Sequence, residues 1–307
     1  RYETTQALAR ALERMRVPVF LAPGNHDFYS ARSPYAALSW PSNVHIFQGS
    51  GLSAVPLPEL RCVVHGAAFT GPYRDDDPLA GVTVPGDGLV HLAVLHGDVG
   101  GRGRYGPIAP ASIAGSGLTY LALGHVHACT GLRRAGETWW AYPGCPEGMG
   151  FDELGEKGVY IGEISKGGNS LEFLPTARRM CLYEKIDITG CETNAAAAEK
   201  VLVALREKYG ENYAENLCKI ELIGTANIIH AEVLSRLGSL YYAKLRDKTE
   251  PPINYEELSH EISLKGLFVK NMLSRLNAAD GEEKENLKEA LKLGLKAFDG
   301  DVSCDEN

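Results

Sequence analysis

The segment from Pro18 to Ser30, PVFLAPGNHDFYS, places three polar side chains together directly after an apolar run. Asn25, His26 and Asp27 follow a Pro-Gly turn, which is a common end for a strand. An amide oxygen, an imidazole and a carboxylate can bind a metal ion or move protons. A turn in which the Asn and Asp side chains bond to their own backbone accounts for the same residues.

Three further histidines follow apolar runs later in the chain. LAVLHGD contains His96, and LALGHVH contains His125 and His127. Residues at positions i and i+2 of an extended segment point to the same side, so both imidazoles of GHVH can face one cleft. A single histidine on an apolar strand is usually a satisfied core residue. Several at similar strand ends favour a shared site, because open α/β sheets place their sites there.

The donor types favour a metal site. Imidazoles with an amide oxygen and no thiolate suit a borderline divalent ion such as Mn, Fe or Zn. The same set suits a pair of ions that activates water and holds a phosphoryl group. Asp27 and Asp98 each follow a candidate ligand directly, so we expect them to support ligands rather than bind metal.

Two arginines follow His96 in the segment GGRGRYG. Arg102 and Arg104 are candidates for binding a substrate phosphate despite the negative total charge of the chain. Ordinary solvated loop arginines are the alternative.

Composition restricts the class of protein. The chain has 307 residues, 44% of them hydrophobic, and a net charge of −8, which argues against nucleic-acid binding through bulk charge. Its seven cysteines include no CxxC pair, which predicts reduced thiols and a cytoplasmic protein. No apolar run approaches the roughly 20 residues of a membrane-spanning helix, and the polar opening does not resemble a signal peptide.

The pattern of elements predicts an α/β fold with two mixed sheets. A helix up to residue 16 precedes the first strand, and later apolar runs predict further strands at 44–47, 61–69, 89–97, 118–125, 138–144 and 158–164. SKGGNS then predicts a turn and LEFLPTARRM an extended connector. We therefore expect an α/β domain over 1–175, an α+β capping domain over 176–250 and a helical segment over 251–307.

The order of GNHD, HGD and GHVH resembles the calcineurin-like metallophosphoesterases, and the resemblance covers roughly residues 1–190. Residues 142–164, YPGCPEGMGFDELGEKGVYIGEI, resemble the SbcD-like DNA repair exonucleases. The resemblance implies a two-sheet α/β/β/α sandwich in which Asn25, His96 and His125 bind one metal ion and His127 binds the other. It also implies that His26 faces the scissile phosphate.

By the same resemblance, we expect a phosphodiesterase that uses two divalent ions, with Mn preferred and Fe or Zn as alternatives. Its substrate would be DNA, its partner an SbcC-type ATPase, and a homodimer is a further expected assembly. A phosphoesterase for small nucleotides or phosphoproteins and a catalytically incomplete scaffold remain alternatives. The carboxyl-terminal helices could bind the ATPase through an apolar face, or use that face to pack on their own domain. The residues of this face are Leu264, Leu267, Phe268, Leu273 and Leu276.

One departure from the family pattern concerns its first motifs. The chain contains no Asp-x-His, and no Gly-Asp precedes GNHD. The comparison implies an amino-terminal truncation that removes the family's first strands, the bridging carboxylate and the other ligands of the ion bound by His127. We therefore expect this segment alone to be nearly inactive and to expose an apolar sheet edge.

Overall fold

The computed structural model describes residues 2–300, which form two compact units. The first unit comprises residues 2–184, 206–220 and 238–244, and the second comprises residues 185–205, 221–237 and 245–300. Residues 301–307, which include Cys304 and the end of the predicted helical segment, lie outside the described part. Within residues 2–300, the helices lack the combination of length and apolar character needed to cross a membrane.

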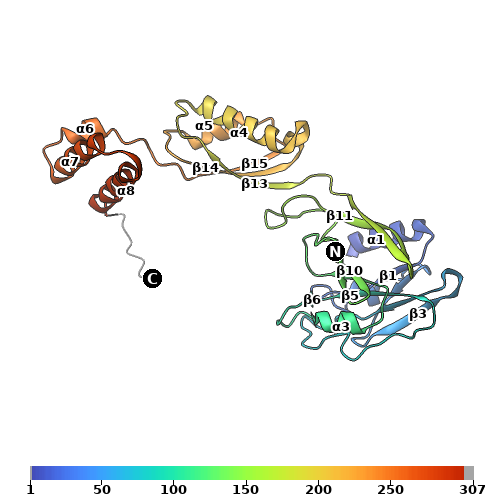
Figure 1. The fold of residues 1–307 in the computed structure, drawn as a ribbon. Helices are drawn as coiled ribbons and strands as arrows, with labels where there is room; N and C mark the ends of the chain where they lie inside the picture. The colour runs from blue at the N-terminus through green and yellow to red at the C-terminus, as the bar shows by residue number, and fades with distance from the viewer. Residues whose placement is uncertain (1, 301–307) are drawn as a thin grey trace. The chain divides into compact units, whose positions relative to one another are not determined.

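A six-stranded sheet dominates the first unit (Figure 1). Its spatial order is β3 (Ser53–Leu57), β4 (Cys62–Gly66), β5 (Val90–His96), β8 (Tyr120–Gly124), β10 (Thr138–Ala141) and β9 (Arg133–Ala135). The four central strands are parallel, and the two edge strands run antiparallel to their neighbours. This mixed sheet confirms the predicted α/β class. The predicted strand at 138–144 forms β10, which joins the parallel set through β8 and pairs antiparallel with β9.

The core of this unit lies on the central strands. Leu121 on β8 and Ala93 on β5 are fully buried, as is Ile113 of the short helix α3 (Pro110–Gly115). Buried and half-buried residues alternate along β5, as the period of a strand requires when one face carries the core. In the register of β5 against β8, His96 pairs with Gly124, so the carboxyl ends of both strands lie level.

Most of the remaining elements up to residue 108 are short. They are α1 (Tyr2–Met15), β1 (Val19–Leu21), α2 (Pro34–Ala37), β2 (Val44–Ile46), a 3-10 turn (Pro58–Leu60), β6 (Asp98–Val99) and β7 (Pro107–Ile108). β1 pairs in parallel with β2 and with no other strand among residues 2–300. Its second edge is therefore open to pairing with a further strand.

An apolar groove of about 930 Å³ lies beside this open edge. Its walls include Phe20 on β1, Val94 on β5, Ala122 on β8 and Ile161 of the next hairpin. His96 lines the same groove, so the groove leads to the end of β5 where the candidate ligands begin.

The segment expected to be a connector forms part of a hairpin. β11 (Gly158–Ser165) and β12 (Gly168–Pro175) pair antiparallel along their whole length. The connector interpretation of LEFLPTARRM was therefore wrong for its first half. The alternation of half-buried and exposed residues on β12 is the pattern of a strand with one covered face.

A separate three-stranded sheet follows, with the order β13 (Cys181–Asp187), β14 (Leu217–Ile223) and β15 (Tyr242–Asp247). The helices of this region are α4 (Asn194–Tyr209), a 3-10 turn (Glu211–Glu215) and α5 (His230–Arg236). The buried residues of α4 include Val201 and Leu205.

The final residues form three helices, α6 (Tyr255–Ser259), α7 (Leu264–Ala278) and α8 (Gly281–Phe298). Their buried cluster includes Val269, Leu276 and Leu291. The predicted apolar face of α7 is split: Leu276 is buried in this cluster, whereas Leu264 and Leu267 are exposed. Packing within the chain therefore accounts for only part of the face.

A buried pair of histidines on the central sheet predicts a pH dependence of stability. His65 Nε2 on β4 lies 2.9 Å from His91 Nδ1 on β5, and His91 Nε2 lies 3.0 Å from Asp87 Oδ1. Burial, followed by the neighbouring His91, lowers the pKa of His65. The unfolded chain then binds a proton more readily than the folded chain, so stability decreases as the pH falls below the ordinary histidine value of about 6.5.

We expect the urea midpoint of unfolding to decrease from about pH 7.5 to about pH 5.5, and to decrease less in His65→Gln. His260→Gln, which changes an exposed histidine at the end of α6, is the matched control and should keep the wild-type dependence. Equal pH dependence in the wild type and His65→Gln would contradict this prediction.

Candidate metal centre

Asn25 and His96 are in direct contact although 71 residues separate them in the sequence. Asn25 follows β1 and is 7% exposed, and its Oδ1 lies 2.8 Å from His96 Nε2 at the end of β5. Neighbouring ligand atoms around a divalent ion with bonds of about 2.1 Å lie about 3 Å apart. The contact between the amide oxygen and the imidazole therefore fits two ligands of one ion.

His125 completes this cluster at the end of β8. Its ring centroid lies 5.1 Å from that of His96, in an edge-on arrangement. The backbone of His125 has a φ of 109°, which is rare for a residue with a side chain and costs conformational energy. Such strain is typical of residues whose side chains are held in place for a function.

Two glycines allow the His96 ring to lie where it does. A Cβ atom on Gly24 would lie 2.6 Å from His96 Cε1, and a Cβ on Gly124 would lie 3.1 Å from His96 Nδ1. Phe69 packs edge-on against the same ring at 5.4 Å between centroids. The glycines therefore leave space for the imidazole against the backbone that carries Asn25 and His125.

The electrostatics of the cluster keep its histidines neutral. Burial, followed by the charge of His125, lowers the pKa of His96 to about 4, and Asp27 acts in the opposite direction. Burial also lowers the pKa of His125, against the influence of Asp98, with smaller contributions from His127 and His26. Neutral imidazoles have a lone pair available for a metal ion at neutral pH.

His26, Asp27 and Asp98 lie around this cluster. His26 and Asp27 are exposed, and both influence the pKa of His96. Asp27 accepts hydrogen bonds from the Gly24 amide at 2.9 Å and from the Tyr35 hydroxyl, so it holds the turn that presents Asn25. Asp98 is half-buried and acts on His125 through its charge.

The two arginines expected at the site differ in their surroundings. Arg104 Nε lies 3.0 Å from Asp75 Oδ1, and the guanidinium stacks on Tyr73 at 4.5 Å. Arg102 is exposed.

Tyr105, in the same loop, lies beside the cluster, with its ring centroid 5.8 Å from that of His125. The sequence reasoning missed Tyr105, although it directly follows Arg104.

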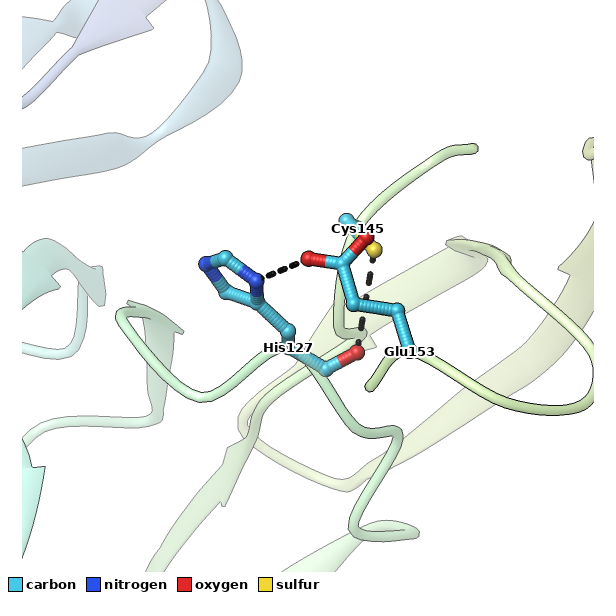
Figure 2. A group of neighbouring side chains, drawn as sticks. All are labelled: His127, Cys145 and Glu153. Carbon is cyan, nitrogen blue, oxygen red and sulfur yellow. Dashed lines mark hydrogen bonds and ion pairs between the residues drawn. The ribbon is translucent and has the colours of Figure 1, made fainter. Parts of the chain in front are cut away.

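His127 has partners that the sequence reasoning also missed. Its Nδ1 is in hydrogen-bonded contact with Glu153 Oε1, and Cys145 lies in the same group (Figure 2). Both residues lie within the quoted segment 142–164. In the sequence, Cys145 could have been noticed because it directly follows a Pro-Gly pair. The spacing of Glu153 gives no indication that it contacts His127.

The space around His96 predicts a strong effect of a small substitution. In Gly24→Ala, the new methyl group must displace the His96 ring or the turn that carries Asn25. We expect the affinity for Mn²⁺ to fall at least about 10-fold, as for other changes that misplace a metal ligand. Isothermal titration calorimetry measures this change. Gly51→Ala, where a Cβ meets nothing within 4 Å, should bind Mn²⁺ as the wild type does, and equal affinities of all three proteins would contradict the prediction.

Comparison with known proteins agrees with this geometry. No protein-family model matches the chain. The chain is 29% identical over 209 residues to a curated protein of Bacillus subtilis (strain 168) named "Uncharacterized metallophosphoesterase YhaO". The matched region is 63% of this chain and 49% of that protein, so the chain spans about half the length of this relative. The similarity supports the metallophosphoesterase interpretation.

Proposed function

We propose that this chain provides the metal-binding cluster of a phosphodiesterase that cleaves DNA. The observation that carries the proposal is the contact of Asn25 Oδ1 with His96 Nε2 at the end of β5, beside His125 at the level end of β8. The similarity to a metallophosphoesterase supports phosphoester hydrolysis as the class of reaction. DNA as the substrate and repair as the role rest on the resemblance of residues 142–164 to the SbcD-like exonucleases.

In this proposal, Asn25, His96 and His125 hold one divalent ion and His127 contributes to holding a second, with Mn²⁺ as the proposed metal. The bound ions would supply positive charge to a phosphoryl group and lower the pKa of a water molecule. The chain's contribution is to present neutral imidazoles and a fixed amide oxygen. Gly24, Gly124 and the bond between Asp27 and the Gly24 amide fix their positions.

His26 is proposed as the catalytic acid. It directly follows Asn25, is exposed, and lies close enough to His96 and His125 to influence their pKa values. An imidazole in this position can donate a proton to the leaving oxygen of a phosphodiester or stabilise its developing charge. Arg102 is proposed to contact a substrate phosphate, whereas Arg104 would first have to leave Asp75.

The proposal includes an SbcC-type ATPase as partner, and the exposed Leu264 and Leu267 on α7 are among the apolar residues available to it. A homodimer is the other assembly that belongs to the proposal.

The test is a substrate comparison with the full-length gene product after removal of metals with EDTA. Hydrolysis of bis-p-nitrophenyl phosphate and of linear duplex DNA should appear when Mn²⁺ is added. Hydrolysis of cyclic nucleotides or phosphoserine peptides without cleavage of DNA would replace the nuclease by another phosphoesterase. Binding of Mn²⁺ without hydrolysis of any of these substrates would indicate a catalytically incomplete scaffold.

A further inference from the structure

Three potential ligands from different segments meet beside the proposed centre. They are His127 after β8, Cys145 after β10 and Glu153 before β11. Their ligand atoms all lie within 4.8 Å of one another. In Figure 2, the imidazole of His127 points toward the Glu153 carboxylate, and the Cys145 sulfur lies on the same side of His127 as that carboxylate.

The backbone holds this group together. Gly144 has a φ of 84°, and a Cβ atom there would lie 2.7 Å from the carbonyl oxygen of His127, so the turn before Cys145 approaches the His127 backbone closely. The Met149 amide donates to Glu153 Oε2 at 2.7 Å, which leaves Oε1 directed at His127. Local contacts therefore set the position of the Glu153 carboxylate and of the backbone that carries His127 and Cys145.

A buried lysine donates a hydrogen bond to the backbone of His127. Lys157 is 4% exposed, and its Nζ donates to the carbonyl oxygen of His127 at 2.9 Å. The Cys145 Sγ lies 3.8 Å from the same oxygen. The lysine thus donates a hydrogen bond to the backbone that carries His127, and the ligand atoms of the three residues lie within 4.8 Å of one another.

We propose that His127, Cys145 and Glu153 form a binding site for Zn²⁺. A nitrogen, a sulfur and an oxygen donor suit a borderline ion with tetrahedral preference, and three protein ligands leave a fourth position open. Ligand atoms around Zn²⁺ lie about 3.3–3.7 Å apart, so small side-chain rotations bring these atoms into place. Binding releases the thiol proton of Cys145 to solvent, and the cation then separates two groups that repel each other when both are ionised.

This inference rests on the proposed function in that both assign His127 to the second metal ion, but it places Zn²⁺ there in place of Mn²⁺. The Cys145 thiolate gives the site at His127 a different metal preference from the site at Asn25, His96 and His125. Mn²⁺ favours oxygen and nitrogen ligands, whereas a cysteine sulfur favours Zn²⁺. We therefore infer two sites with different metal preferences in the same unit.

The test is titration of the full-length, metal-free protein with Co²⁺, which substitutes for Zn²⁺ and absorbs in the near ultraviolet when a thiolate binds it. We expect a thiolate-to-cobalt charge-transfer band that Zn²⁺ abolishes by displacement. The band should disappear in Cys145→Ser and persist in Cys129→Ser, the matched control at an exposed cysteine of the same region. In Glu153→Gln, the affinity for Co²⁺ should fall at least about 10-fold.

Absence of the band in the folded wild-type protein would overturn the inference, as would a band that persists in Cys145→Ser. The wild-type spectrum is decisive even where a variant fails to fold. His96→Ala should keep the band, because His96 belongs to the other cluster. A protein that shows the band but hydrolyses no phosphodiester would refute the proposed function and leave the zinc site intact.

Discussion

Replacing His96 with alanine is expected to reduce Mn²⁺-dependent hydrolysis of bis-p-nitrophenyl phosphate by at least about 100-fold. His96 contacts Asn25 through its Nε2 and lies edge-on to His125, so its loss removes the central nitrogen donor of the cluster. Changes to residues that merely support metal ligands already cost about 10- to 100-fold. Steady-state kinetics of the full-length gene product measure the effect.

The matched control is His260→Ala, at an exposed histidine that ends α6 in the other unit. It should leave the hydrolysis rate unchanged. Circular dichroism of both variants identifies loss of fold as a separate cause. A folded His96→Ala protein with wild-type turnover would show that His96 takes no part in the reaction.

Leu121→Ala is expected to destabilise the first unit by about 3 kcal/mol. Leu121 is fully buried on β8, between β5 and β10, and its replacement leaves a cavity in the core cluster. Urea unfolding followed by tryptophan fluorescence measures this change. All three tryptophans of the chain lie in the first unit, and Trp140 pairs directly with Leu121 in the sheet.

Leu60→Ala serves as the control for this substitution. Leu60 is 62% exposed, so its replacement should change the free energy of unfolding by no more than about 0.5 kcal/mol. Similar losses in both variants would contradict the assignment of the core to β8.

The central sheet could be predicted because its strands are continuous apolar runs. The runs that end at His96 and at Gly124 are β5 and β8 in the structure, and the two strands pair in parallel. The strand β12 was not predicted, because the turn residues of SKGGNS and the proline in LEFLPTARRM indicated a connector, although Leu171 and Phe173 alternate with exposed neighbours. The local composition indicated a connector, whereas the alternation of side chains indicated a strand. The structure agrees with the alternation.

Only part of the candidate site could be predicted from the sequence. The histidines at strand ends indicated a shared site, because the topology of parallel strands brings their carboxyl ends together. The contacts of His127 with Glu153 and of Arg104 with Asp75 depend on how loops fold against one another. No periodicity records such contacts, so Glu153 was missed and Arg104 was expected to be available for a phosphate.

The most direct test of the proposed metal centre is anomalous diffraction from crystals of the protein soaked in Mn²⁺. The account predicts a peak in the anomalous difference map within about 2.1–2.3 Å of Asn25 Oδ1 and of a nitrogen of His96, with His125 as a further ligand. Strong manganese peaks elsewhere on the protein, with none between Asn25 and His96, would contradict it.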